Sequence, residues 1–218
     1  YPALKAPRIQ VPKLEGLEFF ENIHRYRLNG EWLKHSVSHI ASPLSTSEIE
    51  RINQEYPDAI PRGNFVHLQA ENFHLGRTVD FTTEHTKWVE QLINEEFWER
   101  WQPVPGGVET AVADSRFSIG GKLDCLVQHH KTNELAIVDY KTKRSINSAT
   151  KNHAAQLGGY CSLIGQSFRN IDGWITKGFI FNVYENRVEI DTYDIEDCLT
   201  KWVTVRDLYF KQQPSFDF

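Results

Sequence analysis

Two aspartates and a lysine stand close together in the middle of the chain, in the stretch GGKLDCLVQHHKTNELAIVDYK at residues 120–141. Asp124 lies in one apolar run, and Asp139 and Lys141 lie in the next. Neighbouring carboxylates repel each other unless one takes a proton or a cation lies between them. Mg²⁺ or Mn²⁺ prefers carboxylate oxygens and keeps bound waters, one of which can become a hydroxide that attacks a phosphate. A lysine beside that water could orient or deprotonate it, or stabilise charge on the phosphate.

Two strands are expected to bring these side chains together. Runs 122–128 and 135–140 are apolar and rich in β-branched residues, and the polar residues between them are typical of a turn. A symmetric hairpin loop would place Asp124 opposite Asp139, at a Cβ distance of about 4.5–5.5 Å. Asp139 and Lys141 are two residues apart on one strand and therefore point the same way. A solvated hairpin with ordinary surface charges is the alternative, although apolar residues around the charges favour buried strands.

A predicted helix upstream carries polar residues on one face. Residues 64–75 show helical periodicity and are followed by Gly76, a typical helix terminator. Gly63, His67 and Glu71 are four residues apart, so they share a face of this helix. A single helical histidine is more often a packed or surface residue than a metal ligand. This helix alone therefore does not indicate a site.

A second predicted helix, at residues 150–164, follows the lysine strand. Gln156 and Tyr160 lie one turn apart on it, and an amide and a phenol could hydrogen-bond a phosphate or stack on a nucleotide. Simple packing of this helix on the sheet is the alternative. The connection before it, residues 140–153, is basic and contains no acid; its cations are Lys141, Lys143, Arg144 and Lys151.

Taken in chain order, these residues resemble the motifs of the PD-(D/E)XK nuclease superfamily, and of its RecB-type branch in particular. Each motif alone is weak, but five in order at sensible spacing are fairly specific. The Leu-Asp-Cys at 123–125 and the Val-Asp-Tyr-Lys-Thr at 138–142 are similar to the mitochondrial genome maintenance exonuclease family and its bacteriophage relatives. The residues that carry the resemblance are Gly63, His67, Glu109, Gly121, Asp124, Asp139, Lys141, Gln156 and Tyr160.

The resemblance implies an α/β fold, a single domain whose central mixed β-sheet is flanked by helices. It implies one or two Mg²⁺ or Mn²⁺ ions, with Lys141 beside the attacking water, held by His67, Asp124, Asp139 and the Tyr140 backbone carbonyl. Two further acids, expected either as ligands or as groups that hold the ligands in place, are Glu71 and Glu109. The residues expected to guide the DNA are Gln156, Tyr160, Lys143, Arg144 and Lys151.

Members of the exonuclease family are stand-alone enzymes that are specific for single-stranded DNA. The resemblance therefore implies metal-dependent hydrolysis of phosphodiester bonds from the end of a single DNA strand, in replication, repair or recombination. A structure-specific endonuclease on the same fold is one alternative, and a DNA-binding protein that has lost catalysis is another. The complete set of two acids and a lysine disfavours the latter, because loss of function should first remove such costly charges.

Composition limits the range of partners. With 218 residues, of which 40% are hydrophobic, the chain can bury the core of one domain. A formal net charge of −5 argues against a protein that coats DNA by bulk electrostatics, whereas a local basic segment suits an enzyme that grips a few phosphates. No membrane span or signal peptide is visible. We expect DNA as partner, no membrane, no nucleotide cofactor and a monomeric state.

The cysteines bear on the compartment. Cys125, Cys161 and Cys198 are odd in number and far apart, without a CxxC motif, so they indicate neither a disulfide framework nor a cysteine metal cluster. A reducing intracellular compartment is expected, either a bacterial or phage-infected cytoplasm or, with an upstream targeting segment, a mitochondrion. The chain begins at Tyr1 and holds no methionine, from which we expect the natural N-terminus to lie upstream.

The flanking segments are expected to frame this site. Residues 1–60 read as an N-terminal arm, a hairpin and short helices that cover the cleft, and residues 61–218 as the nuclease core. The expected elements are a hairpin at 24–36, a short helix capped by Ser36, a helix at 46–56 capped by Thr46 or Ser47, one helix at 84–101, strands at 108–113 and 116–121, a hairpin at 174–193 and a helix at 195–211.

Overall fold

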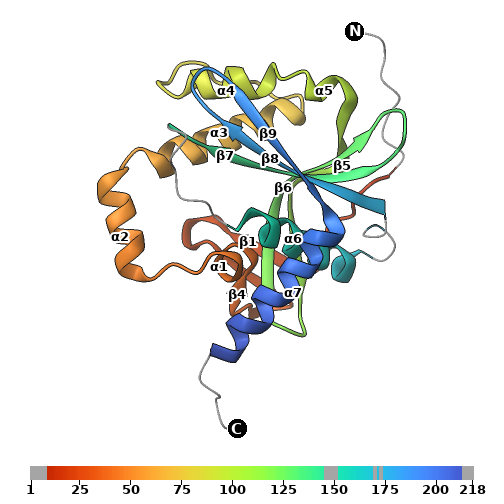
Figure 1. Cartoon of the computed structure of the whole chain (residues 1–218). Helices are drawn as coiled ribbons and strands as arrows, with labels where there is room; N and C mark the ends of the chain where they lie inside the picture. The colour runs from red at the N-terminus through yellow and green to blue at the C-terminus, as the bar shows by residue number, and fades with distance from the viewer. Residues whose placement is uncertain (1–8, 145–151, 169–170, 172–173, 213–218) are drawn as a thin grey trace.

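A mixed β-sheet forms the centre of the computed structural model, which describes residues 9–144, 152–168, 171 and 174–212 (Figure 1). The order of its strands is β4-β6-β7-β8-β9, and β5 also pairs with β6. β7 and β8 run parallel, and the chain passes between them through α6 (His153–Ser167). The strands are β4 (His35–Ser36), β5 (Trp101–Asp114), β6 (Ile119–His129), β7 (Leu135–Thr142), β8 (Ile175–Val183) and β9 (Val188–Asp194).

β6 changes its partner along one edge. Its first residues pair with β4 as far as Gly120, and its later residues pair with β7 from Cys125 onward. The β6–β7 register is the symmetric one predicted from the sequence, and its last pair toward the site is Cys125 with Val138. Residues 121–124 of β6 therefore have no strand partner on this edge within the described part of the chain, and they lie in a gap between the end of β4 and the β6–β7 pairing.

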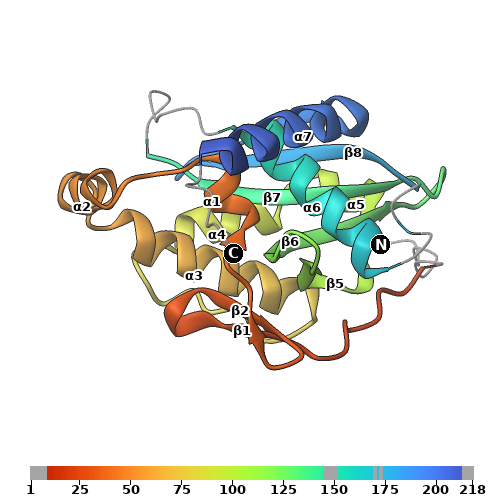
Figure 2. The same ribbon diagram turned by 90° about the horizontal axis from the view of Figure 1, so that it is seen from below.

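Helices cover both faces of the sheet (Figure 2). One buried cluster joins the sheet to α1 (Val37–Ala41), α6 and α7 (Ile195–Gln212). A second cluster joins the other face to α3 (Ala59–His74), α4 (Thr86–Ile93) and α5 (Phe97–Arg100). The predicted α/β fold with a central mixed sheet flanked by helices is thus confirmed. Among the described helices, none is both long enough and apolar enough to cross a membrane.

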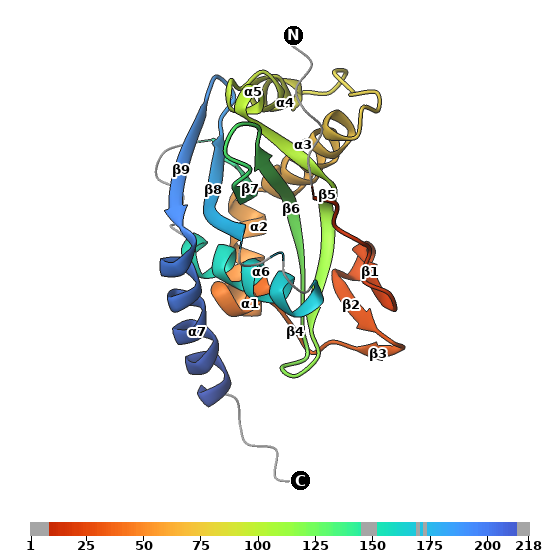
Figure 3. The same cartoon turned by 90° about the vertical axis from the view of Figure 1, so that its right-hand side faces the viewer.

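A small antiparallel sheet stands beside β5 and β6 (Figure 3). Its strands are β1 (Leu17–Phe20), β2 (Arg25–Leu28) and β3 (Glu31–Trp32), with the short 3₁₀ helix η1 (Glu21–Ile23) between the first two. The β2–β3 turn has positive φ at both Asn29 and Gly30, as the predicted hairpin requires. Tyr26 anchors this sheet on β6, because a Cβ at Gly120 would lie 2.4 Å from its ring.

The predicted helix at 84–101 is wrong in its extent. α4 ends at Ile93, α5 spans only Phe97–Arg100, and Trp101 begins β5. Between the two helices the chain folds back, so that the Trp98 Nε1–H donates a hydrogen bond to the carbonyl oxygen of Leu92 at 2.7 Å. The apolar stripe that suggested one helix is still buried, but two elements contribute to it.

Two other expectations need correction. The predicted strands at 116–121 and 122–128 are one strand, β6, which begins after a turn at Ile119. α2 (Thr46–Glu55) is capped by Ser45, whose side chain accepts from the backbone of Glu48 while the Glu48 carboxylate accepts from the backbone of Ser45. Ser45 precedes two other residues of capping type, so composition alone does not choose between them.

Candidate active site

A cleft of about 570 Å³ opens beside the gap between β4 and β7. Its walls come from the N-terminal sheet, α3, the strands β5 to β7 and α6. Ten of the residues singled out in the sequence line it, namely Gly63, His67, Glu71, Glu109, Gly121, Asp124, Asp139, Lys141, Gln156 and Tyr160. Segments more than 90 residues apart in the chain therefore bring their chemically active groups to one place.

His67 of α3 bridges β6 and β7. Its Nδ1 lies 3.2 Å from Asp124 Oδ1, and its Nε2 lies 3.2 Å from the Tyr140 carbonyl oxygen. The backbone N–H of Tyr140 in turn donates to Asp124 Oδ2 at 2.7 Å. Burial alone would lower the pKa of His67, but the carboxylates of Asp124 and Glu109 outweigh it and raise the pKa to about 10. The Asp124 carboxylate thus takes the place of a backbone acceptor for β7, at the point where β6 and β7 stop pairing.

Glu109 reaches the same place from β5. The β5–β6 register shifts between Pro103 and Val108, and Glu109 itself has a φ of 50°, so a bulge turns this side chain toward the cleft. Its Oε2 lies 2.5 Å from Lys122 Nζ, and its Oε1 lies 3.9 Å from His67 Nδ1. His67, Glu109 and Asp124 offer ligand atoms that all lie within 4.8 Å of one another.

Asp139 is held from both sides. The amide of Gln156 donates to Asp139 Oδ1 at 3.1 Å and to the Tyr160 hydroxyl at 3.0 Å, which explains the one-turn spacing on α6. Lys141 Nζ lies 2.5 Å from Asp139 Oδ2. Burial raises the pKa of Asp139 more than Lys141 lowers it.

The pKa values of the two aspartates of the cleft are shifted in opposite directions. Burial would also raise the pKa of Asp124, but His67 and Lys141 reverse the effect and hold that pKa below its ordinary value. The pKa of Asp139 is shifted in the opposite direction. Two carboxylates that share a small buried space are expected to titrate apart in this way.

The donor set fits a hard divalent cation. Three carboxylates, one imidazole and one main-chain carbonyl surround the cleft floor, and oxygen donors of this kind suit Mg²⁺ or Mn²⁺. In the structure, three cationic side chains face the acids instead: His67 faces Asp124, Lys122 faces Glu109 and Lys141 faces Asp139.

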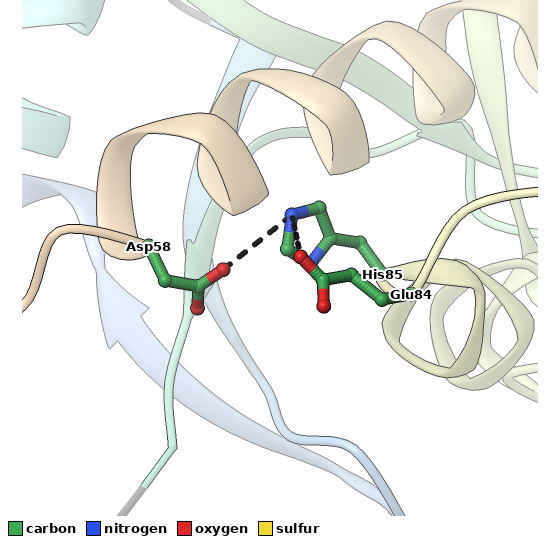
Figure 4. A group of neighbouring side chains, drawn as sticks. All are labelled: Asp58, Glu84 and His85. Carbon is green, nitrogen blue, oxygen red and sulfur yellow. Dashed lines mark ion pairs between the residues drawn. The ribbon is translucent and has the colours of Figure 1, made fainter.

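A second group of potential ligands lies at the start of α3 (Figure 4). His85 Nε2 is 3.5 Å from Asp58 Oδ1 and 3.9 Å from the exposed Glu84 carboxylate. The other oxygen of Asp58 pairs with the buried Arg62 and with Arg144 Nη2, the latter at 2.7 Å. Two guanidinium groups already neutralise Asp58 and would repel a metal cation. This group is therefore an ion-pair network that holds Arg144.

Two of the predicted DNA-binding cations, Lys143 and Arg144, lie away from the cleft wall. The backbone N–H of Lys143 donates to the Val183 carbonyl oxygen, which continues the β7–β8 pairing, and Arg144 is tied to Asp58. Neither residue lines the cleft. Lys151 lies outside the described residues.

Several residues that line the cleft were not predicted from the sequence. Lys122 could have been found, because it stands two residues before Asp124 and therefore shares its face of β6. Phe19, His24 and Tyr26 reach the cleft from the N-terminal sheet. Their local sequence indicates a hairpin, but nothing in it shows where that hairpin packs.

Comparison with solved structures finds proteins similar to this chain. A crystal structure of an Eubacterium rectale protein described as a candidate exonuclease has a TM-score of 0.51 at 14% identity, over 82% of this chain and 79% of that one. The crystal structure of SSO0001 has a TM-score of 0.39 at 17% identity, over 84% of this chain and 78% of that one. No curated protein matches the chain.

At 14% identity the Eubacterium rectale structure bears on the fold alone. The model of the PD-(D/E)XK nuclease superfamily, however, matches residues 84–202, which is more than half of the chain. The matched part includes Glu109, Asp124, Asp139 and Lys141, and in the structure these four side chains line one cleft at the point where two strands separate. The chain therefore belongs to the PD-(D/E)XK nuclease superfamily.

Proposed function

We propose that the chain is a Mg²⁺- or Mn²⁺-dependent exonuclease that removes nucleotides from the end of single-stranded DNA. The observation that carries the proposal is the meeting of acids, an imidazole and a lysine in one cleft of a nuclease fold. The Eubacterium rectale protein of similar fold is described as a candidate exonuclease, which agrees with this choice. Such an enzyme would act in DNA replication, repair or recombination.

The proposed ligands of one or two ions are His67, Glu109, Asp124, Asp139 and the Tyr140 carbonyl. A bound divalent ion would polarise the phosphate and lower the pKa of an attacking water. Lys141 stands beside Asp139, where its ammonium can orient that water or stabilise charge that develops on the phosphate. Gln156 fixes the other oxygen of Asp139 and so orients the carboxylate. Glu71 pairs with Arg77 at 3.2 Å, which favours a supporting role for Glu71.

We further propose that residues 1–60 act as a cover on the nuclease core formed by residues 61–218. Four residues of the N-terminal sheet, Phe19, Glu21, His24 and Tyr26, line the same cleft as the proposed catalytic groups. A cleft of about 570 Å³ has the size of an ordinary ligand site, which suits a few nucleotides better than a duplex. A covered cleft favours entry of a strand end.

The test uses linear single-stranded DNA labelled at either end and the same sequence as a closed circle. Each is incubated with Mg²⁺, Mn²⁺ or EDTA and the wild-type chain, Lys141→Ala or Lys177→Ala. We expect metal-dependent shortening of the linear strand alone, reduced at least about 100-fold in Lys141→Ala. Lys177 lies on β8 and pairs with Glu134 outside the cleft, so Lys177→Ala should behave as wild type.

Each other outcome has a defined meaning. Cleavage of the circle would show an endonuclease on the same residues. Wild-type rates in Lys141→Ala would contradict the role given to this lysine. Absence of cleavage with every metal would favour a DNA-binding protein without catalysis. Wherever cleavage occurs, the end label reports the polarity of digestion.

A further inference from the structure

Three rings of the N-terminal sheet line the cleft with the proposed catalytic groups. The Phe19 ring centre lies 4.8 Å from that of Tyr26 and 5.2 Å from that of His24, the latter edge to face. Tyr26 is buried against β6, whereas Phe19 is partly exposed and His24 is exposed. Docking of the small sheet explains Tyr26 and the inner part of Phe19, which packs against the same cluster, but it leaves the rest of the Phe19 ring and the His24 imidazole open to the cleft.

The exposed His24 is held in an unusual backbone conformation. Its φ is 49°, in the left-handed region that few non-glycine residues adopt, and its backbone N–H donates to the Glu21 carbonyl oxygen. This conformation ends η1 and starts β2 within a single residue. The turned segment places the imidazole on the cleft wall, where its ring packs edge to face against Phe19.

α3 contributes an apolar wall to the same cleft. Ile60, Asn64 and Leu68 follow each other at steps of four, so they form one stripe on this helix. Ile60 is 54% exposed and Leu68 is 52% exposed, although both are large and aliphatic. Neither belongs to a buried core cluster of the described residues. Exposed apolar side chains that gather in one cleft are typical of a binding surface.

A cation lies between the rings and the acids. Lys122 Nζ is 4.8 Å from the centre of the Phe19 ring and 2.5 Å from Glu109 Oε2. A phosphate at the acidic floor would therefore lie next to a cation that already contacts the aromatic wall. A nucleotide has the matching layout, with a charged phosphate at one end and a flat apolar base at the other.

We propose that Phe19 and His24 on one wall, and Ile60 and Leu68 on the other, hold an unstacked nucleobase beside the scissile phosphate. The inference rests on the proposed function and adds a reason for its substrate class. A base inside a duplex presents its faces to its neighbours and cannot lie against these walls. The cleft would thus select single strands through their bases. Stacking tolerates every base, so no sequence preference is expected.

The test compares a linear single strand of ordinary bases with the same strand carrying one abasic residue, both digested in the presence of Mn²⁺. Stacking on an aromatic side chain contributes enough per base to predict a pause at the abasic position, with a local rate about 5- to 100-fold lower. Phe19→Leu keeps the apolar volume but removes the ring, and His24→Ala alters an exposed side chain without touching the core. Each should raise KM for the ordinary strand several-fold and leave kcat nearly unchanged.

The matched control is Trp32→Ala. Trp32 is an exposed aromatic residue of the same small sheet, but it packs against Phe20 and Arg25 and does not line the cleft. This variant should keep the wild-type KM and the wild-type pause.

The results separate this inference from the proposed function. Equal digestion of the two strands, with unchanged KM in Phe19→Leu and His24→Ala, would overturn the base-holding walls while leaving the nuclease intact. Absence of cleavage by the wild type would overturn the proposed function instead. In that case fluorescence anisotropy in EDTA decides, since equal affinity for the ordinary strand and a fully abasic strand would refute the inference.

Discussion

Individual charges in the cleft are balanced by protein groups. Asp124, Glu109 and Asp139 each face a cationic side chain, and buried charges of this kind are tolerated because they are paired. A divalent ion bound at the same acids would take over part of this neutralisation. The contribution of each acidic side chain to metal affinity can therefore be measured by single substitutions, without any substrate.

Mn²⁺ should stabilise the folded chain through Asp124. At a metal concentration about 100 times the Kd, binding to the folded state alone raises the free energy of unfolding by about 2.7 kcal/mol. Asp124→Asn keeps an oxygen that can accept from the Tyr140 N–H but lacks the charge, so it should lose most of this gain. Thermal unfolding in Mn²⁺ and in EDTA measures the difference.

Asp58→Asn is the matched control, because Asp58 belongs to the other group of potential ligands but is neutralised by Arg62 and Arg144. Its Mn²⁺ shift should equal that of the wild type. The reverse pattern, a shift lost in Asp58→Asn and kept in Asp124→Asn, would place the metal at the start of α3.

His74 should make stability depend on pH. It packs against the Trp98 ring at 4.4 Å between ring centres and shares a 2.8 Å hydrogen bond with the Tyr140 hydroxyl. Burial lowers its pKa to about 4, whereas an unfolded histidine titrates near 6.5. The unfolded chain therefore binds the proton first as the pH falls. The contribution of neutral His74 to the free energy of unfolding is complete above about pH 6.5 and is lost as the pH falls from about 6.5 to about 4.

Urea unfolding at pH 7 and pH 4.5 checks this expectation against His74→Gln, whose amide can bond Tyr140 but does not titrate. Between these two pH values the wild type should lose about 2 kcal/mol more than the variant, because each unit of pKa shift corresponds to about 1.4 kcal/mol and the ring is only half-buried. An equal loss in both proteins would show that other groups account for acid sensitivity.

At the scale of elements, the packing of α6 on α7 depends on one glycine. A Cβ at Gly158 would lie 2.0 Å from the Cys198 carbonyl oxygen, so Gly158→Ala must push the two helices apart. We expect a loss of about 1–3 kcal/mol or more in the free energy of unfolding. In α3, a Cβ at Gly63 would meet, among the described residues, only Thr142 Oγ1 at 3.8 Å, so Gly63→Ala should instead gain about 0.5–1 kcal/mol. Urea denaturation measures the change in the free energy of unfolding in both variants. Changes of the same sign would contradict the packing described for the two glycines.

Hairpins were predictable because strand periodicity fixes register once the turn is known. The β6–β7 pairs follow from a symmetric loop, and β8–β9 follow from the turn at Glu185 and Asn186. The prediction of a single helix at 84–101 was wrong for a related reason. Trp101 continues the apolar spacing of the helix, but it pairs with His129 in the sheet, and its buried ring packs against Phe97 and Phe179. A buried residue at helical spacing can equally belong to a strand.

The candidate site was predictable as a set of residues but not as a shape. Asp139, Lys141 and Gln156 lie on elements whose local spacing sets which side chains share a face. The contact of His67 with the Tyr140 carbonyl depends on how α3 packs on the sheet, and the place of Phe19 depends on how Tyr26 docks over Gly120. Neither packing arrangement has a signal in local sequence.

For the molecule as a whole, affinity for DNA is expected to depend only weakly on salt concentration, because few cations line the cleft. The chain carries −5 overall, and among the described residues Lys122 and Lys141 are the lysines that line its cleft. Neutralising two phosphates of a single strand should give a slope of log affinity against log salt of about −1.5. Fluorescence anisotropy with a short single strand in EDTA measures it. A slope of −4 or steeper would mean that cations outside the cleft, such as Lys143 and Arg144, also grip the strand.

The three buried cysteines give the molecule built-in reporters of its own motion. Cys125 follows Asp124 in β6, Cys161 lies in α6 and Cys198 lies in α7, and all three are free thiols. Burial raises the pKa of Cys198 to about 12 and that of Cys125 well above its ordinary range, so neither forms a reactive thiolate while its element is closed. A thiol reagent would label each cysteine only when that element opens. The order of labelling would therefore show whether the strand that carries Asp124 opens separately from the helices behind it.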